Sequence, residues 1–146
     1  MCMVNNNNIY NIFPTSISYK SFLYNLKVNN SLICPYCYST RITRYTSLFH
    51  CNLCNSKFSI TTNTIMHRTK LDYRKWLLSL YLFTFDQNLS YRRLAKIINV
   101  NKNTAYCIIK KFGYLYTYFK IDIIKLMNTD LSDEEILSNI LLITIK

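Results

Sequence analysis

The chain has 146 residues, of which 18 are Lys or Arg and seven are Asp or Glu, for a formal net charge of +11. This length suits one domain or two very small ones. The longest strongly apolar stretch, residues 76–85, is far short of the roughly 20 residues needed to cross a bilayer. The first residues also lack the basic and apolar regions of a signal peptide. These features argue against a membrane or secreted protein, so we expect an intracellular protein whose thiols stay reduced.

The positive charge is concentrated in one part of the chain. Residues 34–112 contain 13 Lys or Arg and only two acidic residues, Asp72 and Asp86, whereas the flanks hold five basic and five acidic residues. A basic block of this kind is typical of proteins that bind an anionic polymer, and it favours nucleic acid as the partner over a surface that is merely solvated.

Residues 1–33 are expected to form a polar tail followed by a short helix. The helix is predicted over residues 18–26, with Phe22, Leu23 and Leu26 on one side. The whole chain contains a single glycine and is rich in Asn. We therefore expect Asn to occupy positions that need a left-handed backbone conformation.

Four cysteines form two pairs, Cys34-x2-Cys37 and Cys51-x2-Cys54, with 13 residues between them. Each pair can bring two sulfurs toward one point, so two pairs can complete a tetrahedral four-sulfur site. Four unbound core thiols would rarely have this spacing, and two disulfides would need an oxidising compartment. The pattern predicts one structural Zn²⁺ ion, bound by these four cysteines in a zinc ribbon over residues 34–68.

The ribbon is expected to contain strands within residues 41–46, 48–50 and 57–62. Each cysteine pair is followed by a position that is often a Gly with positive φ, here Tyr38 and Asn55. Asn tolerates that conformation whereas Tyr is strained in it, so the first cysteine turn is expected to be less regular. We interpret His50 as a strand residue and His67 as a turn residue or phosphate contact, and neither as a metal ligand. Cys2 and Cys107 are interpreted as ordinary thiols.

Helical patterns dominate from residue 69 onward. Thr69-x-x-Asp72 is similar to a capping box and precedes a buried helix over residues 71–85, which residues 86–88 end. Ser90 is predicted to cap a helix over 91–98, and Asn101 a further helix that runs to residue 112. Asn99 would provide the turn between them, and Gly113 would end the second helix.

These last two helices have the spacing of a helix-turn-helix motif. The residues predicted to pack between them are all apolar: Leu94, Ala95, Ile98, Val100, Ala105 and Ile108. The second helix would then present side chains able to reach base edges and phosphates in a major groove. The predicted DNA-binding residues are Asn101, Lys102, Asn103, Thr104, Tyr106, Lys110, Arg92, Arg93, Arg68 and Lys70. An ordinary helical hairpin with a polar outer face is the alternative interpretation.

Three stretches carry a resemblance to a known family. Residues 58–71 are FSITTNTIMHRTKL, residues 74–76 are RKW, and residues 94–105 are LAKIINVNKNTA. In this order, after a zinc ribbon, they resemble the N-terminal region of ISXO2-like transposases and their eukaryotic Merlin relatives, with phrases like FSxxTGTxFHxSKL, RKW and LAxxLGVxxxTA. Asn63 replaces the glycine of the first phrase. The resemblance covers about residues 30–112 and implies binding to the terminal inverted repeats of a mobile element.

Members of that family continue into an RNase H-like domain whose carboxylates bind divalent metal ions for strand cleavage. Only 33 residues follow Gly113 here, with five acidic residues among them. Ser132-x-x-Glu135 predicts a capping box for a final helix over residues 133–144, which accounts for three of those acids. Residues 114–119 favour a continuing helix over a stacking surface for single strands. We therefore expect a transposase-like DNA-binding module that is not itself an enzyme, either a truncated transposase or a stand-alone DNA-binding fragment.

The sequence thus predicts an α+β protein with a small zinc ribbon beside a helix-turn-helix bundle. Its expected segments are a tail with a short helix (1–33), the ribbon (34–68), the helix-turn-helix region (69–113) and C-terminal helices (114–146). The expected partner is double-stranded DNA, in a nucleoid or a nucleus, with neither a membrane nor a small-molecule substrate, and a homo-oligomer is compatible with this role. Two alternatives stay open: a ribbon that docks on an acidic protein partner, and the DNA-binding subunit of a transposase whose catalytic domain lies on another chain.

Overall fold

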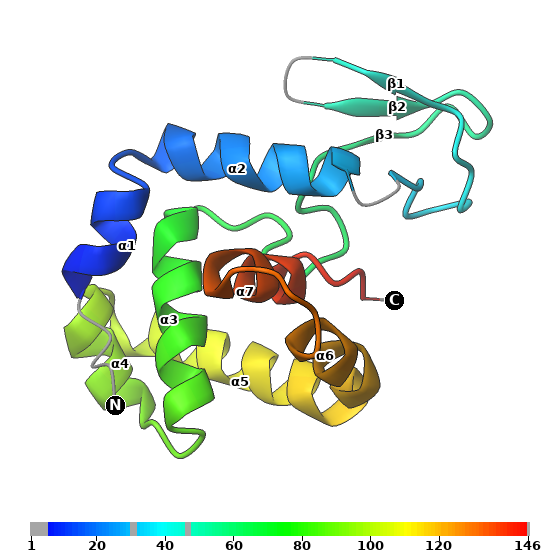
Figure 1. Cartoon of the computed structure of the whole chain (residues 1–146). Helices are drawn as coiled ribbons and strands as arrows, with labels where there is room; N and C mark the ends of the chain where they lie inside the picture. Colours follow the sequence, from blue (N-terminus) through cyan, green and yellow to red (C-terminus); the bar gives the residue numbers. More distant parts are fainter. Residues whose placement is uncertain (1–5, 30–31, 46–47, 146) are drawn as a thin grey trace.

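The computed structural model describes residues 6–29, 32–45 and 48–145, and it combines helices with one small antiparallel sheet (Figure 1). The helices are α1 (Asn6–Ile12), α2 (Ser16–Asn29), α3 (Tyr73–Phe85), α4 (Tyr91–Ile98), α5 (Lys102–Tyr118), α6 (Lys120–Met127) and α7 (Asp133–Leu141). The strands are β1 (Ile42–Arg44), β2 (Phe49–Cys51) and β3 (Lys57–Phe58), in the order β1-β2-β3. The mixed α+β composition predicted from the sequence is confirmed.

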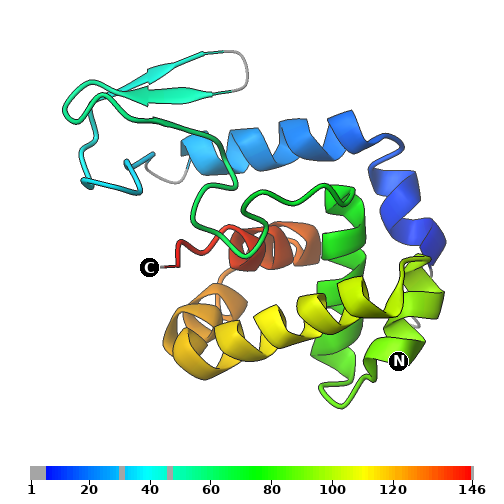
Figure 2. The same cartoon turned by 180° about the vertical axis from the view of Figure 1, so that it is seen from behind.

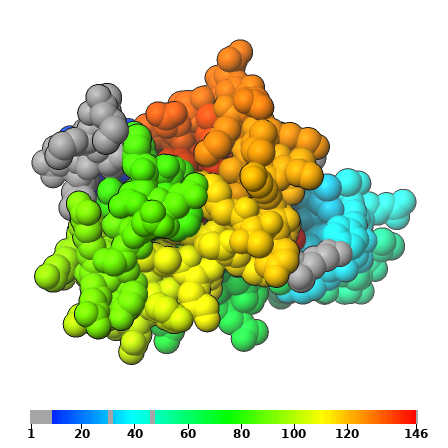
Figure 3. Space-filling model, turned by 90° about the horizontal axis from the view of Figure 1, so that it is seen from below, coloured from blue at the N-terminus to red at the C-terminus, as the bar shows by residue number. Residues whose placement is uncertain are grey.

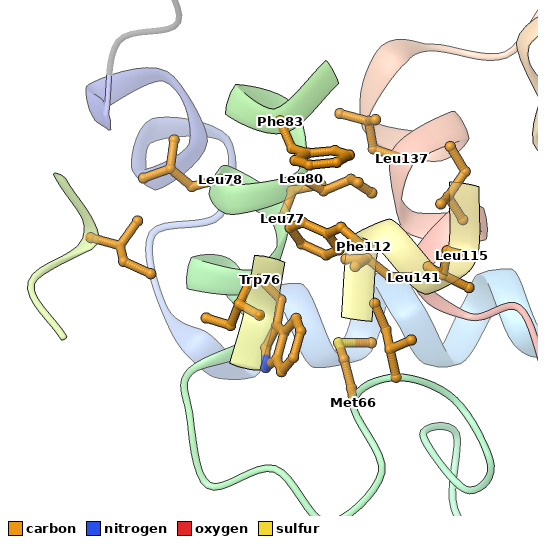
Figure 4. Packing of buried hydrophobic residues seen from close by; sticks show 14 of the residues in the cluster. Met66, Trp76, Leu77, Leu78, Leu80, Phe83, Phe112, Leu115, Leu137 and Leu141 are labelled. Atoms are coloured by element: carbon orange, nitrogen blue, oxygen red, sulfur yellow. The ribbon is translucent and has the colours of Figure 1, made fainter. Parts of the chain in front are cut away.

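Helix α3 lies at the centre of the main hydrophobic core. It contacts α1, α2 and α7 as well as α4 and α5, which explains why it is apolar on nearly every side. Trp76, Leu77, Leu80 and Phe83 are buried between these helices (Figure 4). Phe112 of α5 packs edge-on against Trp76, with ring centroids 6.1 Å apart. The packing on α3 therefore holds α4 and α5 in place.

A second, smaller core lies between the sheet and α2. Phe49 on β2 is fully buried and stacks on Tyr24 of α2, with ring centroids 5.4 Å apart. The ring centroid of Phe58 on β3 lies 5.3 Å from that of Phe49. Nearer the N-terminal end of α2, Tyr19 and Leu23 are buried in the main core. Helix α2 thus joins the sheet to the helical part of the molecule.

Three predicted helix starts are confirmed by their capping hydrogen bonds. Ser90, Asn101 and Ser132 each accept a hydrogen bond from the backbone N–H three residues later, at 3.1, 2.8 and 3.3 Å. Such caps satisfy backbone donors that have no partner inside the helix. The final helix ends at Leu141, three residues before its predicted end.

The start of α3 differs from the prediction. Its N-cap is Asp72, whose carboxylate accepts from the N–H of Arg74 at 2.9 Å, so the helix begins at Tyr73. Thr69 does not cap it, because its hydroxyl instead accepts from the indole N–H of Trp76 at 3.0 Å. Helix α1 lies where the sequence predicts a polar tail, and Ile9 and Phe13 anchor this segment in the main core.

The predicted helix end at Gly113 is wrong. Helix α5 continues to Tyr118, and α6 follows after a break at Phe119, where φ is −122° and ψ is 27°. No glycine has a positive φ, so Gly113 does not provide the left-handed turn that ends many helices. Burial of Leu115 two residues later offsets the cost of a helical glycine, about 1 kcal/mol.

The third predicted strand is shorter than expected. It ends at Phe58, because the Ser59 N–H donates to the Thr62 hydroxyl at 2.9 Å and the Thr62 N–H donates to the Ser59 carbonyl at 3.3 Å. Local hydrogen bonds of this kind compete with strand pairing. The first predicted strand is confirmed over β1, and its last residue, Thr46, lies outside the described residues.

Asn replaces Gly at left-handed positions, as predicted. Asn55, Asn63 and Asn99 have φ values of 61°, 60° and 57°. Tyr38 and Arg68 also have positive φ, at 64° and 58°. In the part of the chain that the structure describes, no helix is long and apolar enough to span a membrane.

Candidate functional site

The two cysteine turns have the same backbone geometry. In the first, the Cys34 N–H donates to the Ser39 carbonyl and the Tyr38 N–H donates to the Cys34 carbonyl, both at 2.9 Å. In the second, Cys51, Ser56 and Asn55 repeat these bonds with the same 2.9 Å distances. The expectation of a less regular first turn is wrong, because Tyr38 takes the positive φ that closes it.

These turns bring the four cysteine sulfurs together. All four Sγ atoms lie within 4.8 Å of one another, with Cys34 3.7 Å from Cys54 and Cys37 3.4 Å from Cys51. A tetrahedral site with metal–sulfur bonds near 2.3 Å requires sulfur separations of about 3.8 Å. The quartet therefore has the donor type and the spacing to hold one metal ion.

The polypeptide around the quartet differs from one sulfur to another. Hydrogen bonds from the hydroxyl and the backbone of Ser56 lower the pKa of Cys54 to about 6. A backbone hydrogen bond from Ser39 acts in the same direction on Cys37, but desolvation and the neighbouring thiols outweigh it and raise the pKa of Cys37 to about 12. Cys34 and Cys51 are buried, whereas Cys54 is exposed. The four groups therefore share a site in which metal binding must displace protons.

Neither histidine belongs to this cluster. Among the described residues, the group that could hold a metal consists of the four cysteines alone. His50 lies on β2 with its Nδ1 3.1 Å from the Asn52 side-chain oxygen. His67 accepts at Nδ1 from the Asn63 N–H at 3.1 Å. Cys107 is exposed on α5, away from the quartet, and Cys2 lies outside the described residues.

Helices α4 and α5 are joined by a tight turn at Asn99. Asn99 is left-handed, with φ 57° and ψ 60°, and the Val100 N–H donates to the Ala95 carbonyl at 3.0 Å. Lys75 of α3 reaches the Asn99 carbonyl at 3.4 Å. Of the six apolar residues predicted to pack here, Val100 is half-buried and the other five are buried. The turn and its packing fix the relative orientation of the two helices.

Figure 3 shows the outer surface of α4 and α5, coloured yellow-green to amber. The exposed charged side chains that these two helices contribute are all basic. No acidic residue occurs between Asp86 and Asp122. Arg92 lies over the Tyr91 ring and Lys110 over the Tyr106 ring, at 5.7 and 5.4 Å, and the two tyrosines meet edge-on at 5.5 Å. The predicted DNA-binding residues that are exposed on this surface are Arg92, Arg93, Asn101, Lys102, Asn103, Tyr106 and Lys110, and Thr104 is half-exposed.

The remaining two predicted DNA-binding residues lie on the segment between β3 and α3. Arg68 and Lys70 are exposed on the turns between β3 and α3. Figure 2 shows this segment passing between the sheet and the helices. It is tied to α5 by Lys111, whose ammonium group donates to the Ile65 carbonyl at 3.1 Å. The structure thus places seven of the ten residues on α4 and α5 and Asn101 at the N-cap of α5, and it leaves two on the turns between β3 and α3.

Several basic residues of the block bind other parts of the protein. Arg74 pairs with the Asp72 carboxylate at 2.7 Å and donates to the carbonyls of Phe13 and Pro14. Lys75 donates to the Asn99 carbonyl and Lys111 to the Ile65 carbonyl. The sequence gives no signal for the contacts with backbone carbonyls, because each of these carbonyls lies on a different segment of the chain. In contrast, exposed Lys96 on α4 could have been added to the predicted surface from its position one helical turn after Arg92.

The chain was also compared with known proteins. No family model matches it, and no match was found among the curated proteins or the solved structures.

Proposed function

We propose that this protein is a double-stranded DNA-binding module that uses α4 and α5 as a helix-turn-helix. The observation that carries the proposal is the basic outer face of these helices, which contains no carboxylate and adjoins a rigid left-handed turn. Lys102, Asn103 and Tyr106 occupy the first turns of α5, where a recognition helix contacts base edges. Arg92 and Arg93 on α4 would bind flanking phosphates.

We also propose that the cysteine quartet binds one structural Zn²⁺ ion. Four thiolates in a tetrahedral arrangement favour zinc or iron, and a closed four-sulfur set has no open position for catalysis. The cysteine turns and three-stranded sheet would then form a zinc ribbon, held against α2. The metal would stabilise the ribbon by cross-linking two turns that are 13 residues apart.

The resemblance to ISXO2-like transposases supports a role at the ends of a mobile element. Asn63 and Asn99 stand where the family phrases have glycine, and both have a positive φ. Because Asn tolerates a positive φ better than most residues, the chain can have Asn at two positions where the family phrases have glycine. The five acids after Gly113 include Asp133, Glu134 and Glu135 in the first turn of α7, where they stabilise the helix end. The role proposed for α4 and α5 in DNA binding requires no catalytic group.

A binding titration at several salt concentrations tests the DNA proposal. Contacts to about six phosphates predict a log–log slope of the association constant against salt near −5. A Lys102→Gln, Lys110→Gln variant should lower the slope magnitude by about two, whereas Lys20→Gln, Lys125→Gln removes two charges on α2 and α6 and should not. Enrichment of one sequence from a random duplex pool would show base recognition. No binding at low salt would reject the proposal.

A further inference from the structure

The sheet presents an outer face that faces away from α2. Strand register places Thr43 opposite His50 and His50 opposite Lys57. Ile42, Phe49 and Phe58 belong to the small core on the other face. Because side chains alternate along a strand, Arg41 and Tyr45 share the side of Thr43. The ring of Tyr45 lies 6.5 Å from that of His50, which supports this placement.

Hydrogen bonds hold the middle of this face in one arrangement. The Asn52 side chain exchanges hydrogen bonds with the Thr43 hydroxyl, at 2.9 and 3.2 Å, and its oxygen also lies 3.1 Å from His50 Nδ1. The Asn52 N–H donates to the Arg41 carbonyl at 2.9 Å. The outer sheet face, defined as Arg41, Thr43, Tyr45, His50, Asn52 and Lys57, is therefore organised without a bound partner.

The charge of this face is entirely positive. Arg41 lies just before β1 and Lys57 lies on β3, and both are exposed. They are two strand spacings apart across the sheet and two residues apart along it, which separates their backbones by roughly 12 Å. No acidic residue occurs in the chain before Asp72. A rigid polar face with cations on both edges, and without any carboxylate, complements a row of phosphates.

We propose that the outer sheet face is a second DNA contact surface, which binds the phosphate backbone of duplex DNA. A single strand suits it less well, because single-strand surfaces stack successive bases on several large aromatic side chains. Tyr45 is the one Tyr, Phe or Trp among the residues that define this face. The sheet and α4 lie at opposite ends of the molecule in both views (Figures 1 and 2). The protein would therefore cover a longer stretch of DNA than α4 and α5 contact. The choice of DNA as partner rests on the proposed function, but the face and its charges do not depend on α5.

The test compares two double variants of the full-length, metal-loaded chain. Arg41→Gln, Lys57→Gln removes both charges of the outer sheet face, whereas Arg44→Gln, Lys20→Gln removes the same charge from the opposite side of β1 and from α2. Salt-dependent binding to a 40-base-pair duplex and hydroxyl-radical footprinting are measured for each. The outer-face variant is expected to lower the magnitude of the salt slope by about two and to shorten the footprint at one end, and the control variant to change neither.

Each outcome separates this inference from the proposed role of α5. If the outer-face variant behaves like its control while Lys102→Gln, Lys110→Gln weakens binding, the second surface is rejected and the role of α5 stands. If only the outer-face variant weakens binding, the second surface stands and the role of α5 is rejected. A loss seen with a 40-nucleotide single strand but not with the duplex would overturn the assignment to duplex DNA. Unchanged zinc content and far-UV circular dichroism would show that both variants remain folded.

Discussion

The hydroxyl of Tyr19 on α2 and that of Ser138 on α7 form a buried hydrogen bond of 2.8 Å across 119 residues of sequence. Both residues have no exposed surface. The bond lies beside α3, which α2 and α7 both contact. It therefore joins the two ends of the chain around the helix that supports α4 and α5.

Tyr19→Phe is expected to destabilise the protein by about 1–2 kcal/mol, because it leaves the buried Ser138 hydroxyl without its partner. Tyr116→Phe is the matched control: the Tyr116 hydroxyl is also buried but has no hydrogen-bond partner among the described residues. Its removal should leave stability unchanged or raise it. Urea unfolding measures both, and equal losses would contradict the role assigned to the Tyr19–Ser138 bond.

Gly113→Ala is expected to stabilise the protein by about 1 kcal/mol. Gly113 lies inside α5, and no neighbouring atom would lie within 4 Å of an added Cβ. Alanine has the higher helix propensity and loses less backbone entropy on folding. Thermal unfolding should show a rise of about 2–4 °C. A fall would mean that α5 does not continue through this position.

Acid should weaken the start of α3 through Asp72. Partial burial opposes ionisation, but the hydrogen bonds and charge of Arg74 outweigh it and lower the pKa of Asp72 below its ordinary value. A lowered pKa means that this stabilisation is complete above about pH 4 and is lost as the pH falls through the folded-state value. Asp72→Asn should be less stable than the wild type near neutral pH, and the difference should shrink in acid. Urea unfolding between pH 7 and 2 measures this, with Asp130→Asn as the control for the loss of one exposed carboxylate.

Asn99→Ala should loosen the turn between α4 and α5, whereas Asn99→Gly should preserve it. The backbone at Asn99 is left-handed, a conformation that costs a residue with a Cβ about 1–2 kcal/mol and that Asn and Gly tolerate better. Asn99→Ala is therefore expected to lower the unfolding free energy by about 1 kcal/mol and to weaken DNA binding. If Ala and Gly behave alike in thermal unfolding, strain at this turn is not important.

Removing one sulfur of the quartet should abolish metal binding. Cys51→Ser is expected to reduce the zinc content from about one per chain to near zero, since a structural site needs all four ligands. The sheet amides should then lose their protection from hydrogen exchange. Cys107→Ser, which changes an exposed thiol on α5, should retain the metal. Metal analysis by mass spectrometry also distinguishes zinc from iron.

Short-range patterns were sufficient for much of this architecture. Each Cys-x2-Cys turn, the caps at Ser90, Asn101 and Ser132, and the turn at Asn99 depend on residues within about five positions of one another. Their geometry follows from local hydrogen bonds and from the conformations that each residue type allows. The sequence therefore predicted the sulfur cluster and the helix pair at the level of individual residues.

Other features depended on partners that are distant in the sequence. Gly113 does not end α5 because Leu115 is buried in the main core, and the apolar residues Ile9 and Phe13 fix a segment expected to be a polar tail. Arg74, within the basic block, donates hydrogen bonds to the carbonyls of Phe13 and Pro14, which are 61 and 60 residues away. The outer sheet face required the strand register before its residues could be assigned to one side. Packing against α3 and pairing between strands decide these points, because burial and cross-strand contacts outweigh local preference and neither can be seen from neighbouring residues alone.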